Sequence, residues 1–311
     1  MRSLRTETAV LAGPRGAVVV ESIHLSDPGP GEVLLRMEAC GVCHSDVFVT
    51  TLEKLPLAPL TLGHEGIGRV EAVGEGVEGW SAGDRAGVTF LGTTCGACEW
   101  CTSGRERFCP KQTNFGYTLQ GALGGYAIAP AAALIRVPET IAAEVAAPLC
   151  CAGWTAYRAV QEAGLAPGQS LALFGFGGLG HLALQVAQHQ GARVSVSDPS
   201  EEKMEAARAA GAGGNTRGSD AAIVFTAAPA AIPQAFRALK RNGTLVLVGL
   251  AAGSSYELPL IDTVLKGITI RGSYLGTRND LARVFALAGE GVLRPQVSRC
   301  PRIFIQKLRH I

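Results

Sequence analysis

The sequence lacks the features that would place this chain in a membrane, in the secretory pathway or on nucleic acid. It contains no run of about 20 apolar residues, so no membrane-spanning helix is expected. The first residues, Met1 to Glu7, include no apolar core of the kind found in secretory signal peptides. A formal net charge of only +2 gives no general attraction to nucleic acid or to anionic membranes. Internal repeats and low-complexity segments are also missing, which excludes a solenoid or a disordered chain.

What is present is the composition of a two-domain globular protein. The chain has 311 residues, of which 47% are hydrophobic and 17% are charged, enough for two substantial cores. Up to about residue 150, short β-like runs such as 18–20, 33–35 and 68–73 predict a small barrel-like domain. From there strands alternate with helices, as in an α/β domain with a parallel sheet. The sequence predicts strands over 170–174, 193–197, 221–226, 243–248 and 268–270, and helices over 181–189, from Pro233 to Lys240 and over 280–289.

Four of the nine cysteines lie in one short stretch: Cys95, Cys98, Cys101 and Cys109. The spacing is C-x2-C-x2-C-x7-C, and Gly96 and Gly104 allow the sharp turns that a loop around one ion requires. Four thiolates are a closed tetrahedral set, typical of structural zinc. The alternative is two disulfides or four unrelated cysteines, which is less common for closely spaced cysteines in an intracellular enzyme.

A second set of metal-binding residue types lies on both sides of this loop. Cys43, His64 and Glu65 precede it, and the adjacent pair Cys150 and Cys151 follows it. Two cysteines and one histidine make a three-ligand zinc site with an open position, at which the metal acts as a Lewis acid. Each residue taken alone is more simply interpreted as a core cysteine or a satisfied polar histidine. The metal interpretation therefore depends on the cofactor motif described next.

The glycine motif Gly175-Phe-Gly177-Gly178-Leu-Gly180 follows the predicted strand 170–174 and precedes the predicted helix 181–189. This context is that of a dinucleotide-binding turn: the first glycine makes the turn, the second admits the pyrophosphate and the third lets helix pack on strand. The pyrophosphate would rest on the helix N-terminus. The alternative is a glycine-rich turn without a cofactor.

Asp198 lies 18 positions past the last glycine, at the end of the predicted strand 193–197. There its carboxylate can accept hydrogen bonds from the adenosine ribose hydroxyls and would repel a 2′-phosphate. The sequence therefore favours NAD over NADP, although Arg193 or Lys203 would tolerate NADP.

Taken together, these motifs resemble those of zinc-dependent medium-chain alcohol dehydrogenases of the bacterial and yeast type. The resemblance runs from about residue 10 to about residue 297, with motifs in the family's order at 39–46, 62–68, 83–85, 95–109 and 147–155. It implies a GroES-like, β-rich catalytic zinc-binding domain over 1–150, completed by about 277–311. It also implies an NAD-binding Rossmann domain with a doubly wound parallel sheet over 151–276.

The resemblance also implies roles for single residues. The catalytic zinc would be held by Cys43, His64 and Cys151, since Cys151 directly precedes Ala-Gly, and Glu65 would be an alternate ligand. With the four-cysteine loop, this makes two zinc ions per chain, one catalytic and one structural. Asp46 would accept from the free nitrogen of His64.

The remaining implied roles concern the cofactor and the proton. Ser45 would hydrogen-bond the substrate oxygen and pass its proton on, and His44 would approach the NAD pyrophosphate. Thr155 and Leu179 would lie near the nicotinamide, completing a cofactor-binding set with the glycine motif and Asp198.

The chain departs from the family at several places. Phe48 stands where relatives commonly carry the histidine that ends the proton relay, and phenylalanine carries no proton. Only about ten residues separate the helix ending near Ala210 from the next strand, so one edge strand and one helix should be missing. That loss should uncover the neighbouring strand and some apolar surface. The C-terminus from Ser298 to Ile311 does not resemble the family.

These observations predict a cytoplasmic enzyme that transfers hydride between a primary alcohol, or an aldehyde in reverse, and NAD. Thiolate zinc sites indicate a reducing compartment. A polyol or amino-alcohol dehydrogenase fits the ligand motifs less well. The alternative from another class is a catalytically impaired homologue that binds NAD and zinc, given Phe48 and the C-terminus. The resemblance implies a homo-oligomer, a tetramer or dimer, with no nucleic-acid or membrane partner.

Overall fold

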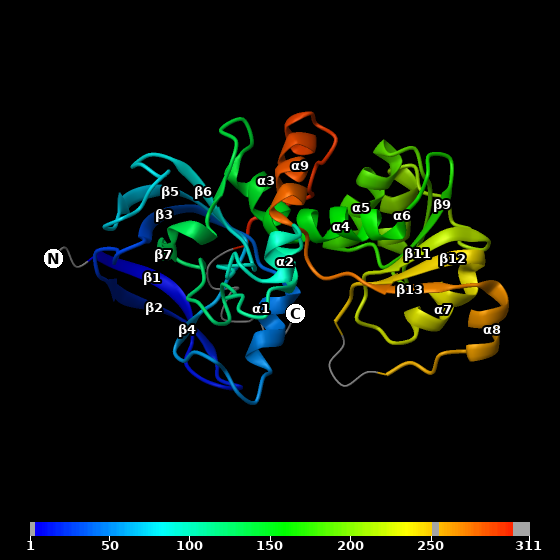
Figure 1. The fold of residues 1–311 in the computed structure, drawn as a ribbon, viewed down its shortest axis with the longest axis horizontal. Coiled ribbons are helices and arrows are strands. Elements are labelled where there is room, and N and C mark those ends of the chain that lie inside the picture. The colour runs from blue at the N-terminus through cyan, green and yellow to red at the C-terminus, as the bar shows by residue number, and fades with distance from the viewer. Residues whose placement is uncertain (1–3, 251–254, 301–311) are drawn as a thin grey trace. The chain divides into compact units, whose positions relative to one another are not determined.

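The computed structural model describes residues 4–250 and 255–300, and the chain forms two compact units (Figure 1). One unit runs to Cys151 and takes up the chain again from Gln296, whereas the other spans Ala152–Pro295. Within the described ranges, no helix is long and apolar enough to cross a membrane.

The first unit is built mainly from strands, in two sheets. A three-stranded sheet has the order β2-β1-β4 and a five-stranded sheet the order β7-β3-β5-β6-β8. Buried side chains such as Val33, Leu35, Val70 and Phe115 form the core of the larger sheet. The strands are β1 (Leu4–Leu11), β2 (Val18–Leu25), β3 (Glu32–Cys40), β4 (Leu60–Thr61), β5 (Gly66–Val73), β6 (Arg85–Val88), β7 (Tyr126–Pro130) and β8 (Ile135–Arg136).

Short helices in the first unit carry several of the predicted metal-binding cysteines. Cys43 precedes one of them, Cys98 another, and Cys150 and Cys151 lie within a single π-helical turn. The helical segments are α1 (His44–Thr50), α2 (Glu99–Thr102), η1 (Glu106–Phe108), η2 (Ala131–Ala133), α3 (Ala143–Pro148) and the π-helical η3 (Leu149–Gly153).

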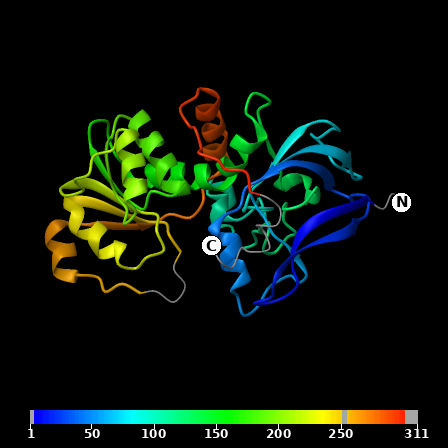
Figure 2. The ribbon, with the colours of Figure 1, turned by 180° about the vertical axis from the view of Figure 1, so that it is seen from behind.

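The second unit is a five-stranded sheet in the order β10-β9-β11-β12-β13, with every neighbouring pair parallel. The elements are α4 (Trp154–Ala163), β9 (Ser170–Phe174), α5 (Gly178–His189), β10 (Arg193–Ser197), α6 (Glu201–Ala209), β11 (Ser219–Val224), α7 (Ala231–Ala238), β12 (Leu239–Leu247), α8 (Leu260–Lys266), β13 (Thr269–Gly272) and α9 (Arg278–Gly289). Helices α4, α5 and α6 cover one face of the sheet and α7 and α8 the other, as Figures 1 and 2 show from opposite sides. This is the doubly wound arrangement that the sequence predicted.

The predicted loss of an edge strand is visible at β10. Between α6 and β11, the chain pairs with β10 only through Gly213, whose N–H donates to Val194 O and whose carbonyl accepts from Val196 N, at 2.8 and 2.9 Å. The expectation of exposed apolar surface there is wrong, because Val194 and Val196 are buried at 6% and 0% exposure. The edge strand is lost without uncovering the core.

Exposed apolar side chains gather instead at the opposite edge of the sheet. The sequence did not predict α8, which has no buried residue and presents Leu260, Ile261, Val264 and Leu265 at 66–75% exposure. It precedes β13, the edge strand at this end. The predicted C-terminal departure lies mostly in 301–311, outside the described residues.

Candidate active site and metal centres

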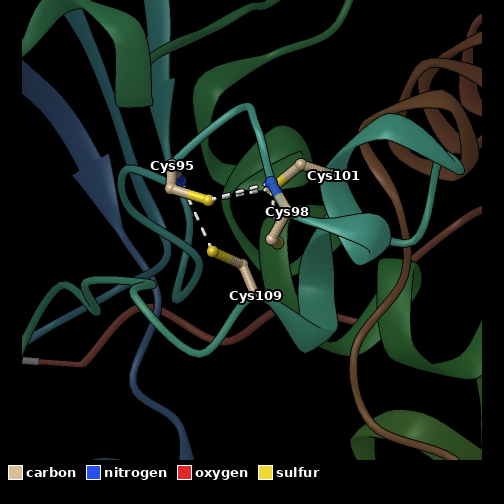
Figure 3. A group of neighbouring side chains, drawn as sticks. All are labelled: Cys95, Cys98, Cys101 and Cys109. Atoms are coloured by element: carbon tan, nitrogen blue, oxygen red, sulfur yellow. Dashed lines mark hydrogen bonds between the residues drawn. The ribbon is translucent and has the colours of Figure 1, made fainter.

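The four cysteines of the short loop converge in the structure (Figure 3). The four sulfur atoms lie within 4.8 Å of one another, with Cys95–Cys101 and Cys98–Cys101 separations of 3.9 and 3.5 Å. These values are far too long for disulfides, and all nine cysteines are free. A tetrahedral zinc with bonds of about 2.3 Å needs sulfur separations of about 3.8 Å. The donor set therefore fits zinc, and the disulfide alternative is wrong.

Local backbone geometry explains why this loop closes on itself. Gly96 and Gly104 both adopt φ +69°, in the left-handed region that favours glycine. Backbone N–H groups of Ala97 and Cys98 point at the Cys95 sulfur and lower the pKa of its thiol to about 6. A thiolate is the form that binds metal, so the loop prepares a ligand before any ion arrives.

The second cluster gathers residues from three distant parts of the first unit. The ligand atoms of Cys43, His64, Glu65 and Cys151 all lie within 4.8 Å of one another, and the two sulfurs are 3.9 Å apart. Cys43 is the N-cap of α1, and the π-helical turn η3 carries Cys151. By contrast, Cys150 is fully buried and its thiol donates to the Ala146 carbonyl at 3.6 Å. The structure thus places Cys151, and not its neighbour, in this cluster.

The Asp46 carboxylate contacts three N–H groups at this cluster, those of Cys43, Gly63 and the His64 ring. Its Oδ2 accepts from Cys43 N at 2.9 Å, while its Oδ1 accepts from Gly63 N and lies 3.2 Å from His64 Nδ1. Asp46 and His64 are almost completely buried, at 1% and 2% exposure. Burial alone would lower the pKa of His64, but the Asp46 carboxylate raises it well above its usual value. With Nδ1 engaged by Asp46, Nε2 is the ring nitrogen available to a metal.

Glu65 is a buried carboxyl within the same cluster. Burial, followed by the nearby Cys43 sulfur, raises its pKa to about 8. A feature that the sequence analysis missed makes room for this side chain: a Cβ at position 41 would lie 1.9 Å from Glu65 Oε2, so a larger residue there would displace the carboxylate from its place in the cluster. A glycine two positions before a ligand cysteine was the available signal.

The contact between the two thiols of the cluster shifts their pKa values in opposite directions. A hydrogen bond from Cys151, and then one from His64, lowers the pKa of Cys43 well below its usual value. The same bond and burial raise the pKa of Cys151. A cation in the site would favour the thiolate of both. Two thiols, one imidazole and a carboxylate within reach are a donor set that suits zinc.

The predicted relay residues begin α1, beside this cluster. His44 is exposed at the first position of the helix, and Ser45 is half-buried with its backbone N–H 3.4 Å from the Cys43 sulfur. Phe48 lies one turn further on and is half-buried. The ring of Phe90 meets that of His64 edge-on, with centroids 5.3 Å apart.

The glycine turn of the second unit is open where a phosphate would approach. Gly175 has φ +98°, and a Cβ at Gly180 would lie 2.1 Å from the Gly175 carbonyl oxygen. In contrast, a Cβ at Gly177 or Gly178 would meet no atom within 4 Å. Asp198 follows β10, and its carboxylate accepts from the backbone N–H of Phe176 within this turn, at 2.8 Å. The structure thus brings the glycine motif and Asp198 together.

Two further predicted residues belong to the second unit. Leu179 is half-buried in the first turn of α5. Thr155 is 7% exposed near the start of α4, and its hydroxyl has no hydrogen-bond partner. Because a buried polar group without a partner is costly, this hydroxyl is a candidate contact for a bound molecule.

The fold of both units is shared with known proteins. Residues 29–139 match the model of the alcohol dehydrogenase GroES-like domain, and residues 213–290 match that of the zinc-binding dehydrogenases. An alcohol dehydrogenase of Geobacillus stearothermophilus is 38% identical over 94% of this chain and 91% of its own.

Solved structures agree with this match. Acetophenone reductase from Geotrichum candidum, in complex with NAD, is 29% identical with a TM-score of 0.87, covering 100% of this chain and 94% of its own. A zinc-binding dehydrogenase from Sinorhizobium meliloti bound to NADP is 25% identical with a TM-score of 0.85, covering 94% and 90%.

The chain belongs to the zinc-dependent medium-chain alcohol dehydrogenase family. It is an oxidoreductase of that family, with a GroES-like unit, a Rossmann-type unit and a small-molecule substrate.

Proposed function

We propose that this enzyme transfers hydride between primary alcohols and NAD, in either direction. The observation that carries the proposal is the buried cluster of Cys43, His64, Glu65 and Cys151, whose ligand atoms lie within 4.8 Å of one another. Such a set with two thiols and one imidazole, and a carboxylate as alternate ligand, is that of a catalytic zinc with an open position.

Two zinc ions per chain complete this proposal. Cys43, His64 and Cys151 would hold the catalytic ion, and Cys95, Cys98, Cys101 and Cys109 the structural one. The catalytic ion, when bound, supplies a Lewis acid that lowers the pKa of the alcohol. Glu65, whose pKa is raised to about 8, would be an alternate ligand of that ion.

The chain's own residues orient the ligands and move the proton. Asp46 holds Nδ1 of His64, which fixes the ring and leaves Nε2 for the metal. The Ser45 hydroxyl both donates and accepts, so it takes the alcohol proton and passes it on. Since Phe48 carries no proton, the relay ends at a ribose hydroxyl and water, or at His44, the nearest ionisable side chain in sequence.

NAD binding rests on the second unit. The open backbone at Gly177 and Gly178 receives the pyrophosphate, and Asp198 accepts from the adenosine ribose hydroxyls, which favours NAD over NADP. The unpartnered hydroxyl of Thr155 supports a contact near the nicotinamide. Leu179 would press on the ring, whose role in the reaction is to carry the hydride.

The test is zinc per chain on purified protein, together with NAD reduction over primary, secondary and aromatic alcohols. We expect two zinc ions and turnover fastest on a primary alcohol. A secondary or polyol substrate turned over faster would overturn the substrate class, and faster reduction of NADP would overturn the cofactor.

One observation favours a second candidate, a homologue that binds NAD and zinc without efficient turnover. Phe48 lies on the helix that begins beside Cys43 and offers no group for the outer end of a relay. Two zinc ions and tight NADH binding, with no turnover on any alcohol of the panel, would select this candidate.

We also propose a homo-oligomer in a reducing cytoplasm, with α8 covered by a second copy. Four large apolar side chains at 66–75% exposure, beside the edge strand β13, support this. A stable dimer buries about 800 Å² per partner, more than four side chains expose, so neighbouring surface must contribute. Light scattering should find at least a dimer, and Ile261→Asp should reduce its size. A monomeric wild-type chain would overturn this proposal.

A further inference from the structure

The carboxylate of Asp198 is already bound on both oxygens by the protein itself. Oδ2 accepts from Phe176 N at 2.8 Å, and Oδ1 accepts from Ser200 N at 3.0 Å. Ser200 is the N-cap of α6, and Phe176 lies between the first two glycines of the turn. One side chain thus connects the glycine turn to the start of the next helix.

The other hydrogen bonds of the glycine turn lie at its two ends, where the Gly177 carbonyl accepts from His181 N at 3.1 Å and lies 3.1 Å from His181 Nδ1. Gly175 occupies the left-handed region at φ +98°, and its N–H donates to Ser197 O at 3.0 Å. Gly177, the N-cap of α5, has no side chain to cap the helix. The next three amides, of Gly178, Leu179 and Gly180, have no acceptor within the helix because they belong to its first turn. Their direction depends on the peptide planes of the turn before them.

We propose that Asp198 is a positioning residue for the pyrophosphate, acting through the Phe176 amide, in addition to its role at the ribose. The hydrogen bond fixes the peptide plane between Gly175 and Phe176, so the free amides of α5 stay aimed at one point. This inference rests on the proposed binding of NAD in this turn, and deepens it.

The two roles predict opposite results for an anion that has no ribose. If Asp198 only recognised the ribose, its removal would take a negative charge away from the phosphate site, and inorganic pyrophosphate would bind more tightly. If Asp198 positions the turn, its removal frees the backbone, and pyrophosphate binds more weakly despite the favourable change in charge.

The experiment measures inorganic pyrophosphate as a competitor of NADH on the full zinc-loaded chain, for wild type, Asp198→Ala and Asp198→Asn. We expect pyrophosphate affinity to fall about tenfold in Asp198→Ala, the scale of one lost charge-assisted hydrogen bond. Asp198→Asn should fall less, because its amide oxygen still accepts from one N–H. Hydrogen exchange at the Phe176 amide should accelerate in Asp198→Ala without any ligand.

Asp220 provides the matched control. It lies in the same sheet, and its Oδ2 accepts from Ser170 N at 2.9 Å, at the start of β9 and not at its glycine end. Asp220→Ala loses the same kind of bond, so a general loosening of the unit would weaken pyrophosphate binding in both variants. We expect Asp220→Ala to leave the affinity for pyrophosphate unchanged.

The cofactors themselves give a second readout. In Asp198→Ala, affinity for NADPH should rise relative to NADH while both absolute affinities fall. Unchanged or tighter pyrophosphate binding in Asp198→Ala, or an absolute gain in NADPH affinity, would overturn the positioning role and leave NAD binding standing. A wild-type chain that binds neither NADH nor pyrophosphate would overturn the proposed cofactor as well.

Discussion

Replacing Asp46 by asparagine should weaken zinc binding at the site of Cys43, His64 and Cys151 by roughly 10- to 100-fold. The substitution keeps the shape of the side chain and removes only its charge and one acceptor. Asp46 is 1% exposed, so water does not compensate for what is lost. The effect should therefore appear in metal affinity while the fold persists.

The magnitude follows from the three donors around Asp46. An asparagine oxygen at the Oδ1 position still accepts from Gly63 N and His64 Nδ1, both 3.2 Å away in the wild type. Its NH2 group then faces Cys43 N, which donates to Oδ2 at 2.9 Å, so two donors oppose each other. Losing one hydrogen bond to a charged group costs about 1.5–3 kcal/mol. That range corresponds to roughly 10- to 150-fold in an equilibrium constant.

The assay is competition for zinc with a chelator of known affinity, with the four-cysteine loop left intact so that one ion per chain remains as an internal reference. Asp84→Asn is the control: Asp84 Oδ2 accepts from Ser81 N at 2.9 Å in the same unit, away from both clusters. Equal zinc affinity in Asp46→Asn and wild type would refute the argument that Asp46 orients these ligands.

Three further predictions follow from the same structure. Ser45→Ala should lower turnover by about a hundredfold with zinc content unchanged, since it removes the relay hydroxyl; unaltered turnover would remove Ser45 from the relay. Cys98→Ser should leave one zinc per chain and lower the unfolding temperature, and retention of two ions would contradict the structural site. Burial raises the pKa of Asp220, but the Lys240 ammonium and the Ser170 donors outweigh it and lower the pKa from 3.8 to about 2. The resulting stabilisation is present above pH 4 and is lost as pH falls towards 2. The unfolding free energy of wild type should therefore exceed that of Asp220→Asn by about 2 kcal/mol more at pH 6 than at pH 2; a difference independent of pH would contradict this.

The features best predicted from sequence are those fixed by short spacing or by a buried pattern. The spacing C-x2-C-x2-C-x7-C is typical of a four-cysteine zinc loop, so the spacing alone indicated the cluster that the structure contains. The apolar run 170–174 was predicted as a strand with the bounds that β9 has in the structure. The next helix begins at Gly178, three residues before the predicted start at His181. Glycine is a poor helix former, so Gly178 and Gly180 gave no indication that the helix had begun.

Other features depend on contacts that no local pattern contains. Glycine at position 41 leaves room for Glu65, 24 residues later, and Asp46 accepts from the backbone N–H of Gly63, 17 residues later. The helix α8 was not predicted, and no local pattern indicates that its apolar side chains are exposed, since the apolar face of a helix is normally buried. The hydrogen bond from the Phe176 amide to Asp198 was not predicted for the same reason, because Phe176 lies 22 positions earlier in the chain.

The missing edge strand shows why such a shortening is compatible with the dehydrogenase fold. An edge strand pairs on one side only, so its removal breaks a single ladder and leaves the pairing of β9, β10 and β11 intact. The single bridge at Gly213 still occupies part of the edge of β10, and the apolar side chains of that strand remain buried. The glycine turn and Asp198 both belong to β9, β10 and the loops that follow them. The residues proposed to hold a dinucleotide's phosphates therefore lie among the strands whose pairing survives. The shortening changes only the outer edge of the sheet.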